Sequence, residues 1–409
     1  MPPKTGVLSR AFVTLTHRFL RALLGLLAAT ASLIAHAQSL EPLKPPAGWK
    51  PEMGYINPFP NDRPIEQITR LNVKAHEEKL SPGLHALLDR YADFRIPVYV
   101  TRRAGADSQE ALAKHAPFPE PKNGLEVITN VLRRYLGGGT EREGRAFPVR
   151  ANGQTYAIEY WSRRIYASNL DSPDSNLLFV AMGGFLSPAT LRGKVALIHE
   201  PINIGTEPRK AWIYDPAQRR VRRAPDLAYD AVPEASEGMF TADQVDGFSG
   251  SPDRFDWHLI GKKPMLVPYN TYDIGLAGAQ PERLLRKGSV NPDLMRYELH
   301  RVWIVEATLK PGQSHIYGKR RFYIDEDSWT VLMEEACSRR GDLWRVALHG
   351  LVQAYDVGVP WIRVSIYHDL DSGSYFVGGL DTDRKPSIRF NQRGSMADFS
   401  PDALRRHAR

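Results

Sequence analysis

The sequence predicts an α+β fold that is mainly β, with a large curved antiparallel sheet and helices packed inside or over it. Two observations support this prediction. From about residue 145 onward, short runs rich in aromatic and β-branched residues alternate with turns that contain Gly, Pro, Asn and Asp, which is typical of strands and their connections. Helical patterning between these runs is scarce, so a parallel sheet built from β-α-β units is not expected. We expect the sheet to curve because many long strands cannot stay flat.

The first 37 residues have the three-part pattern of a cleavable secretory signal peptide. Four basic residues and no acidic residue precede an apolar stretch, residues 22–34, and Ala35-His36-Ala37 closes the segment. The stretch is shorter than the roughly 20 residues that a membrane-spanning helix needs, and no cysteine follows it for lipid attachment. We therefore expect cleavage after Ala37 and a soluble, diffusible protein in the periplasm of a Gram-negative bacterium.

The composition argues against several classes of function. The signal peptide accounts for half of the formal net charge of +8, so nucleic-acid binding loses its main support. Cys337 is the only cysteine, so we expect no internal disulfide and a stability that comes from the hydrophobic core. Export also separates a protein from ATP and nicotinamide cofactors, and we expect no cofactor.

Residues 38–62 predict an extended arm that can lie across the fold. Proline fixes φ and removes a backbone donor, so a proline-rich segment rarely forms a helix or a central strand. The prolines of this arm are Pro42, Pro45, Pro46, Pro51, Pro58 and Pro60.

Two amphipathic helices are expected after the arm. Ser81 is a cap residue before a proline at the first helical position, and Asn123 is followed three residues later by Glu126, as in a capping box. Three consecutive glycines, residues 137–139, end the second helix. The apolar stripes expected to face the core are Leu84, Leu87, Leu88 and Tyr91 in the first helix and Leu125, Ile128, Val131, Leu132 and Tyr135 in the second.

The strand-like runs follow one another in an order that indicates a meander. Short helical pieces are expected only near residues 281–286 and 401–406. The expected strands cover residues 156–161, 177–182, 195–198, 211–214, 300–309, 315–324, 329–335, 343–352 and 361–369.

Several longer segments resemble a known fold family. Residues 211–225 read as a strand, an Asp-Pro turn and a basic return strand, and residues 315–329 as a strand, an acidic turn and a strand that lead into Arg339-Arg340-Gly341-Asp342-Leu343-Trp344. These segments resemble the carrier fold of LolA and LolB, the bacterial lipoprotein-sorting proteins. Within that superfamily the chain resembles a domain-of-unknown-function family of exported proteins. The segments that carry this resemblance are residues 240–263, with Asp246-Gly247-Phe248 and Asp256-Trp257, then Pro268-Tyr269-Asn270, and residues 291–311, with Glu298-Leu299-His300-Arg301.

The resemblance extends from about Leu71 to Phe390 and implies an incomplete antiparallel barrel wrapped around plug or lid helices, with an apolar cavity between them. One domain then spans residues 63–409, with helices in about 63–139, the half-barrel in about 145–390 and a short C-terminal helix in about 400–407. Such a shape suits a carrier, because an open barrel offers a curved apolar wall. A lipid chain gains about 0.8 kcal/mol for each methylene removed from water, so it does not cross an aqueous compartment unescorted.

The candidate wall of this cavity consists of aromatic and aliphatic residues in the expected strands. The alternative is that they only fill a core, which is the commoner role of such residues one by one. The candidates are Tyr156, Ile158, Tyr160, Trp212, Tyr214, Trp303, Val305, Phe322, Trp329, Val331, Met333, Trp344 and Val346.

Four arginines flank Val221 in an expected hairpin: Arg219, Arg220, Arg222 and Arg223. Guanidinium groups can hold a phosphate or carboxylate headgroup, or an acidic partner, through paired hydrogen bonds. The alternative is a solvated edge strand whose charges prevent aggregation.

No motif in the sequence predicts a metal site or a catalytic centre. The acidic residues Asp243, Asp246, Asp253 and Asp256 do not match the spacing of a calcium-binding EF-hand, and turn formation and capping explain them better. The segment 247–251 lacks the final glycine of a nucleophile elbow, and the histidines show no zinc spacing. His300, in a strand near Glu298, is expected to be structural rather than a catalytic base.

These expectations favour a non-enzymatic periplasmic carrier or chaperone for a lipid, a lipoprotein acyl chain or another hydrophobic molecule, with transient contact to a membrane surface. An alternative is an adaptor for an outer-membrane or RND-type transporter complex, and a less favoured one is an envelope hydrolase. A filled barrel interior would favour the adaptor over the carrier.

Overall fold

The structure, a computed structural model, describes residue 50 and residues 57–102, 116–204, 207–224, 230–276, 278, 280–382 and 388–408. All of them belong to one unit, Leu43–Arg409. The predicted signal peptide and most of the predicted proline-rich arm lie outside the described residues.

Sixteen strands form one sheet, whose long strands are two antiparallel meanders. Pairing between β16 and β3 joins the end of the second meander to the start of the first, so the predicted meander is confirmed. The first meander contains β3 Gly139–Val149, β4 Ile158–Tyr166, β6 Leu177–Ser187, β7 Val195–Pro201, β8 Lys210–Asp215 and β9 Arg220–Arg223. The second contains β10 Phe255–Pro268, β11 Tyr297–Leu309, β12 Lys319–Asp325, β13 Val331–Cys337, β14 Leu343–Ala354, β15 Val359–Asp369 and β16 Tyr375–Leu380.

Short strands complete the sheet at its margins. β1 Glu66–Ile68 and β2 Ile96–Val98 extend it beside β11, and β17 Ile388–Phe390 pairs with β3. β5 Leu170–Asp171 and β18 Gly394–Ser395 form a separate two-stranded sheet.

Each predicted strand overlaps an observed one, but the sequence analysis missed β3, β10 and β16 as strands. β10 is the longest, and six of its residues between Asp256 and Pro264 are exposed; in the described part of the chain it is an edge strand that pairs only with β11. Its first half carries a strand signal, since Phe255, Trp257 and Leu259 alternate with Asp256 and His258, but Gly261 and Pro264 interrupt this pattern. β16 is short and contains two glycines, which weaken the strand pattern.

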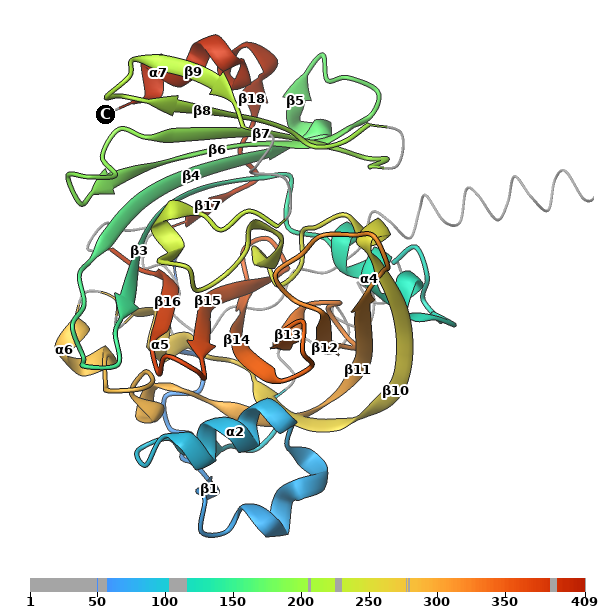
Figure 1. Ribbon diagram of the computed structural model, residues 1–409, viewed down its shortest axis with the longest axis vertical. Helices are drawn as coiled ribbons and strands as arrows, with labels where there is room; N and C mark the ends of the chain where they lie inside the picture. The colour runs from blue at the N-terminus through green and yellow to red at the C-terminus, as the bar shows by residue number, and fades with distance from the viewer. Residues whose placement is uncertain are drawn as a thin grey trace, which may run out of the picture. The chain divides into compact units, whose positions relative to one another are not determined.

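The sheet is open and curved, as predicted. Figure 1 shows the first meander folded over the second, so that the two form facing layers. Register shifts between Leu259 and Gly261 and between Gly378 and Leu380 add local twist. We call the concave face between the two meanders the inner face and the opposite face the outer face.

Both predicted helices are present, with their predicted N-caps, but α4 ends at Arg133, before the predicted glycine stop at residues 137–139. In α2, Pro82–Arg90, the Ser81 hydroxyl accepts a hydrogen bond from the backbone N–H of Leu84 at 3.2 Å. In α4, Gly124–Arg133, the Asn123 side chain accepts from the backbone N–H of Glu126 at 2.9 Å. These interactions span three residues, so the local sequence is sufficient to specify them.

The predicted apolar stripe of α4 is partly wrong. Leu125 and Tyr135 are 46% and 47% exposed, whereas Val127 is fully buried beside Ile128 and Val131. The reason is tertiary: a Cβ on Gly124 would lie 2.9 Å from the backbone of β10, so the helix contacts the sheet on the face that carries residues 124, 127, 128 and 131.

The two helices do not form a common plug. The backbone N–H of Gly83 in α2 donates to Glu335 on the outer face of β13 at 2.6 Å, and Leu84, Leu87 and Leu88 pack with the core of that face. The core around α4 contains the opposite side of the same strands, including Val305 and Phe322. Helices therefore pack over the sheet, as predicted: α2 covers the outer face and α4 one end of the inner face. The implied plug or lid made of both helices is not confirmed.

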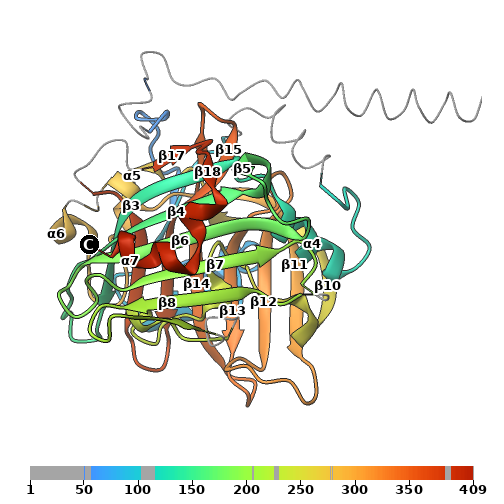
Figure 2. The ribbon, with the colours of Figure 1, turned by 90° about the horizontal axis from the view of Figure 1, so that it is seen from above.

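Smaller elements cover the remaining surfaces. In the segment 400–407, the 3-10 helix η11, Pro401–Ala403, leads into α7, Leu404–His407, and Figure 2 shows α7 across the outer face of the first meander. The other pieces are α5 Tyr272–Leu276, α6 Pro281–Leu284 and the 3-10 helices η2 Val73–Lys79, η3 Ala167–Asn169, η5 Glu234–Ser236, η6 Ala242–Gln244, η7 Pro252–Arg254, η9 Pro292–Leu294 and η10 Met396–Phe399.

Candidate functional site

Residues 230–254, which precede β10, lie on the inner face between the two meanders (Figure 1). We call this segment the plug, residues 233–240 the plug tip and residues 241–249 the plug base. The plug contains η5, η6 and η7 and no longer helix. The interior of the half-barrel is therefore filled by irregular chain instead of the predicted helices.

A buried ionic network holds the plug base to the second meander. Arg320 of β12 donates from Nη1 to Asp243 Oδ2 and from Nε to Glu334 Oε1 of β13, each at 2.6 Å. Gln244 donates to the other oxygen of Glu334 at 2.9 Å. All four side chains are buried. Burial raises the pKa of Asp243, but the positive charge of Arg320, together with the contacts of Asp243 to His315 and Thr241, outweighs this effect and holds the pKa well below its usual range.

Aromatic rings surround the guanidinium of Arg320. Its Cζ lies 4.9 Å from the ring centre of Phe322, 5.4 Å from Phe248, 5.7 Å from Tyr317 and 5.8 Å from Phe255. Cation–π contacts of this kind strengthen when water is excluded. The plug base thus combines paired charges with an aromatic enclosure.

A second ion pair holds the plug base to the first meander. Arg164 of β4 contacts Asp246 Oδ2 at 2.5 Å, and Arg134 donates to the Asp246 carbonyl at 2.7 Å. Asp246 and Gly247 adopt positive φ values of 57° and 83°. A Cβ on Gly247 would lie 2.6 Å from Val331, so this turn requires glycine.

The plug tip is held differently. Phe240 stacks on Tyr367 at 4.6 Å and meets Phe376 edge-on at 5.2 Å. With Met239 and Ala235 it packs on an apolar part of the inner face that we call the tip pocket, formed by Ala146, Ile158, Tyr160, Phe185, Leu191, Ala347, Tyr367 and Phe376.

Two polar contacts at the solvent-exposed rim complete the attachment of the tip. Lys194 pairs with Glu234 at 2.7 Å, where the Glu234 side chain is 65% exposed. The hydroxyl of Tyr156 donates to Glu237. Exposed contacts of this kind contribute about 0–1 kcal/mol each.

A groove of about 810 Å³ opens beside the plug tip, within the usual range for ligand sites. It lies between the turn after β3, the tip residues Glu237, Gly238 and Met239, and the turn after β15. The remaining lining residues are Pro148, Val149, Arg150, Ala151, Asn152, Gln154, Thr155, Tyr156, Arg345, Asp369, Ser372, Ser374 and Tyr375.

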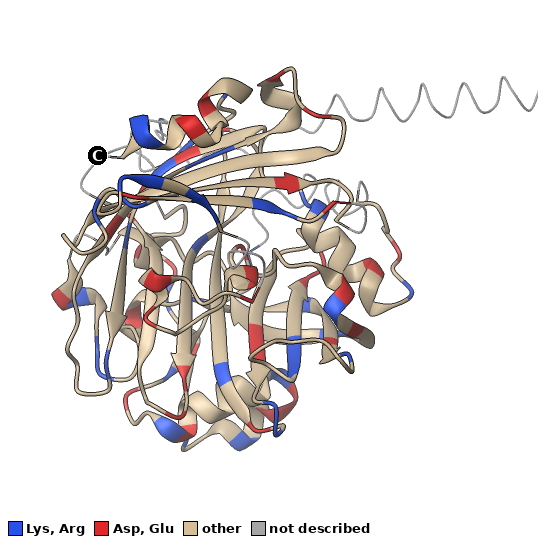
Figure 3. Ribbon diagram, turned by 45° about the horizontal axis from the view of Figure 1, so that its top comes forward, with Lys and Arg blue, Asp and Glu red and all other residues tan. Residues whose placement is uncertain are grey.

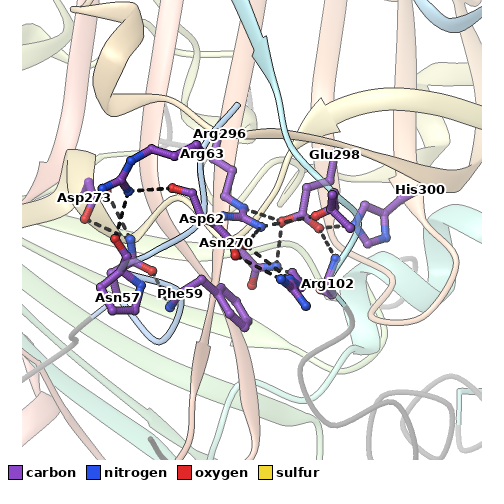
Figure 4. Close-up of polar contacts among 12 residues, drawn as sticks. Asn57, Phe59, Asp62, Arg63, Arg102, Asn270, Asp273, Arg296, Glu298 and His300 are labelled. Carbon is purple, nitrogen blue, oxygen red and sulfur yellow. Dashed lines mark hydrogen bonds and ion pairs between the residues drawn. The ribbon is translucent and has the colours of Figure 1, made fainter. Parts of the chain in front are cut away.

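A separate polar cluster attaches the end of the arm to β11 (Figure 4). Asp62 pairs with Arg102 at 3.0 Å and with Arg296 at 2.8 Å. Fully buried Glu298 accepts from Asn270 at 3.0 Å and from Arg296 at 2.5 Å, and His300 Nε2 lies 3.0 Å from its other oxygen.

The ring of His300 stacks on Tyr269 at 3.7 Å. The contact with Tyr269 joins the end of β10 to β11, whereas Glu298 belongs to the same strand as His300. The motifs Pro268-Tyr269-Asn270 and Glu298-Leu299-His300-Arg301 thus meet at this place, and the structural role of this histidine stays a prediction.

A family model described as "Protein of unknown function (DUF1329)" matches residues 67–116 and 104–405. The chain belongs to the DUF1329 family. This match confirms the resemblance to a domain-of-unknown-function family seen in the sequence. The uncharacterised protein PA3922 of Pseudomonas aeruginosa is 40% identical over 387 residues, which cover 88% of this chain and 85% of PA3922.

Two solved structures are similar at lower identity. A DUF1329 family protein from Desulfovibrio piger has 15% identity and a TM-score of 0.48, over 69% of this chain and 97% of that one. A domain from Vibrio parahaemolyticus, named for outer membrane lipoprotein sorting, has 14% identity and a TM-score of 0.48, over 69% of this chain and 98% of that one.

The structure of this DUF1329 protein distributes the predicted wall residues over both faces of the sheet. Tyr156 lines the groove, and Trp344 packs on Arg345 next to it. Ile158 and Tyr160 form part of the tip pocket. Trp303, Val305, Phe322, Trp329 and Val331 lie in the core around α4 and the plug base, Met333 and Val346 in the outer core with α2, and Trp212 and Tyr214 under α7. The expectation of one continuous wall is corrected, and ligand contact by any of these residues stays a prediction.

The four predicted arginines lie at an edge of the sheet. Arg219, Arg220, Arg222 and Arg223 are exposed, and β9 pairs only with β8 in the described part of the chain. Arg223 lies over the ring of Trp212 at 5.5 Å. Figure 3 shows basic residues of the first meander and of the neighbouring C-terminal segment on this side.

The acidic residues of the predicted loop have three separate roles. Asp243 and Asp246 form the ion pairs of the plug base, and Asp246 also lies in a turn, with a φ of 57°, as turn formation predicts. Ser251, not Asp253, caps η7: its hydroxyl accepts from the backbone N–H of Asp253 and donates to the Asp253 carboxylate. Asp256 is exposed on β10. Within the described residues, no group of His, Cys, Asp and Glu side chains has the arrangement of a metal site. None of the described helices has the length and apolarity to cross a membrane.

The sequence analysis missed the plug and its partner Arg320. A signal for Arg320 existed: it shares strand parity with the apolar residues Phe322 and Ile324, so it had to face the same buried side. An arginine on a buried face requires an acidic partner. The identity of that partner was out of reach, because Asp243 lies 77 residues away.

Proposed function

We propose that this protein is a non-enzymatic periplasmic carrier or chaperone for a lipid, a lipoprotein acyl chain or another hydrophobic molecule, which replaces the plug tip. The observation that carries this proposal is the tip itself. Phe240 and Met239 occupy an apolar, aromatic-lined pocket beside a groove of about 810 Å³. The tip side chains thus stand where an acyl chain would bind.

The energy of such an exchange is balanced. A buried Phe or Met side chain contributes about 1.5–3 kcal/mol relative to exposure, and a buried methylene about 0.8 kcal/mol. A chain that buries several methylenes in the tip pocket therefore offsets the lost contacts of Met239 and Phe240. The polar side-chain attachments of the tip are exposed contacts, so they oppose its release only weakly.

The plug base supports the proposal by limiting the motion. Asp243 and Asp246 hold it to both meanders through ion pairs. We therefore expect the tip to swing while the base stays in place. Such a local opening exposes only the tip pocket and leaves the rest of the half-barrel filled.

Replacement of Phe240 by alanine tests this function. The substitution removes the stacking on Tyr367 and lowers the stability of the closed tip by about 1–2 kcal/mol, so uptake of a fluorescent fatty acid should rise about tenfold. Phe390→Ala is the matched control, because Phe390 also packs edge-on against one ring, that of Trp361, but in a different core. No uptake by either the wild type or Phe240→Ala would overturn the carrier proposal.

A second candidate, the adaptor for an outer-membrane or RND-type transporter, is favoured by the filled interior of the half-barrel. The exposed arginines of β9 would be its contact surface. It predicts that Arg220→Gln with Arg222→Gln abolishes copurification of a transporter component from the cell envelope while Phe240→Ala has no effect. Unchanged copurification with the arginine variant would contradict it.

A further inference from the structure

We propose that the groove beside the plug tip binds an anionic head group, a carboxylate or a phosphate, through Arg345. This inference rests on the proposed function: the apolar part of the carried molecule lies in the tip pocket and its charged end in the groove. Met239 connects the two sites, since it lines the groove and packs in the tip pocket.

Arg345 is a largely buried cation with spare donors. Its side chain is 8% exposed, and its guanidinium lies 4.0 Å from the ring centre of Trp344. Nη1 donates to the Tyr317 hydroxyl at 2.9 Å. Within the described residues, Nη2 has no hydrogen-bond partner, and the residue lines the groove. The structure thus holds a rigid guanidinium at the wall of an open site.

The acidic neighbour Asp369 does not satisfy Arg345. Their contact joins Nε to Oδ2 at 3.4 Å, longer than the usual distance of a charged hydrogen bond. Oδ2 also accepts from the indole of Trp344 at 3.0 Å, and Oδ1 accepts from the backbone N–H groups of Asp371 and Ser372 at 3.1 and 2.8 Å. Asp369 therefore stabilises the turn after β15, and the guanidinium lacks the paired contact that a bound anion would supply.

The charges that line the groove change when the tip is released. Arg150 and Arg345 face two acidic residues there, Asp369 and Glu237. Glu237 belongs to the plug tip and accepts the hydrogen bond of Tyr156. When the tip is released, the Glu237 carboxylate leaves the groove. Two cationic side chains, Arg150 and Arg345, then remain with one carboxylate, that of Asp369, which is already hydrogen-bonded. Entry of the apolar chain and binding of an anionic head are therefore coupled.

The test compares the binding of three probes that have the same hydrocarbon chain and different head groups: oleyl alcohol, oleate and oleoyl lysophosphatidate. We expect the two anionic probes to bind the wild-type protein more tightly than the alcohol, and Arg345→Gln to weaken them about tenfold or more. Binding of the alcohol should stay unchanged. The tighter of the two anionic probes identifies a carboxylate or a phosphate as the preferred head.

Arg340→Gln, in the exposed turn after β13, is the matched control and should alter none of the affinities. If Arg345→Gln does not fold, Arg150→Gln and a rise in salt concentration replace it, since both should weaken only the anionic probes. Failure of all three probes to bind would overturn the proposed function. Binding of the alcohol with no advantage for the anions, or with no loss in Arg345→Gln, would overturn this inference alone.

Discussion

The plug base and the plug tip lie on the same inner face, a few residues apart in the sequence, and are attached by opposite kinds of interaction. In the base, Asp243 pairs with Arg320 away from water, and partly buried Asp246 pairs with Arg164. The tip places Phe240 on an apolar wall, and its polar contacts are at the exposed rim.

This difference indicates which part of the interior can exchange with a ligand. Breaking one side of a buried ion pair leaves an uncompensated charge in a low-dielectric environment, which costs several kcal/mol. Removing an apolar side chain from a pocket that another apolar group can enter costs little net free energy. We therefore expect the base to behave as part of the fold and the tip as a replaceable group.

The largest effect is expected from Arg320→Met. Both Asp243 and Glu334 lose their buried counter-ion, so the free energy of unfolding should fall by about 3–5 kcal/mol in a urea titration. Arg321→Met is the neighbouring control, because its pair with Glu306 is partly exposed and contributes about 0–1 kcal/mol. Equal losses in the two variants would show that the base is no better anchored than the surface.

A pH titration of stability distinguishes the carboxyl group of Asp243 in the plug base from another buried carboxyl group, that of Asp325. Burial, together with the charge of Asp327, raises the pKa of Asp325 to about 6, so its folded pKa exceeds the unfolded value of about 3.9. Its contribution to stability is present below that unfolded value and is lost as the pH rises through about 6. This loss amounts to about 2–3 kcal/mol between pH 4 and 7.

In Asp325→Asn, the stability measured by urea unfolding should therefore vary less over pH 4–7 than in the wild type. The depressed pKa of Asp243 has the opposite sign: its contribution is present above about pH 4 and is lost only at lower pH. Release of the plug base at pH 5 would contradict this assignment.

The smallest effect on global stability is expected from Tyr156→Phe combined with Lys194→Gln. The double variant removes both rim contacts of the tip and should lower the free energy of unfolding by less than about 1 kcal/mol. Hydrogen exchange should nevertheless accelerate in residues 233–240 and stay unchanged in residues 241–249. Lys319→Gln, which removes an exposed pair with Glu306 elsewhere, should alter neither segment.

Local elements of this fold could be predicted because their causes lie close together in the chain. The caps at Ser81 and Asn123 depend on contacts across three residues. The long strands of the second meander follow from apolar and aromatic runs such as residues 343–352. The edge strand β10 escaped although Phe255, Trp257 and Leu259 alternate with polar residues, because Gly261 and Pro264 interrupt the pattern soon afterwards.

The candidate site could be predicted only in part. Tyr156, Ile158 and Tyr160 were proposed as wall residues, and the structure places them at the groove and in the tip pocket. Met333 and Val346 were proposed on the same grounds but face α2, because a strand pattern does not say which of two buried faces is concave.

The sequence by itself determined most of the long strands, the helix N-caps and the family of this protein, since all of these depend on neighbouring residues or on the linear motifs that they form. Only the tertiary structure decided what fills the half-barrel. The partners there are far apart in the chain: Arg320 meets Asp243 across 77 residues, and Phe240 meets a ring of β15. Contacts of this kind depend on how the two meanders fold over each other, a property that no local pattern encodes.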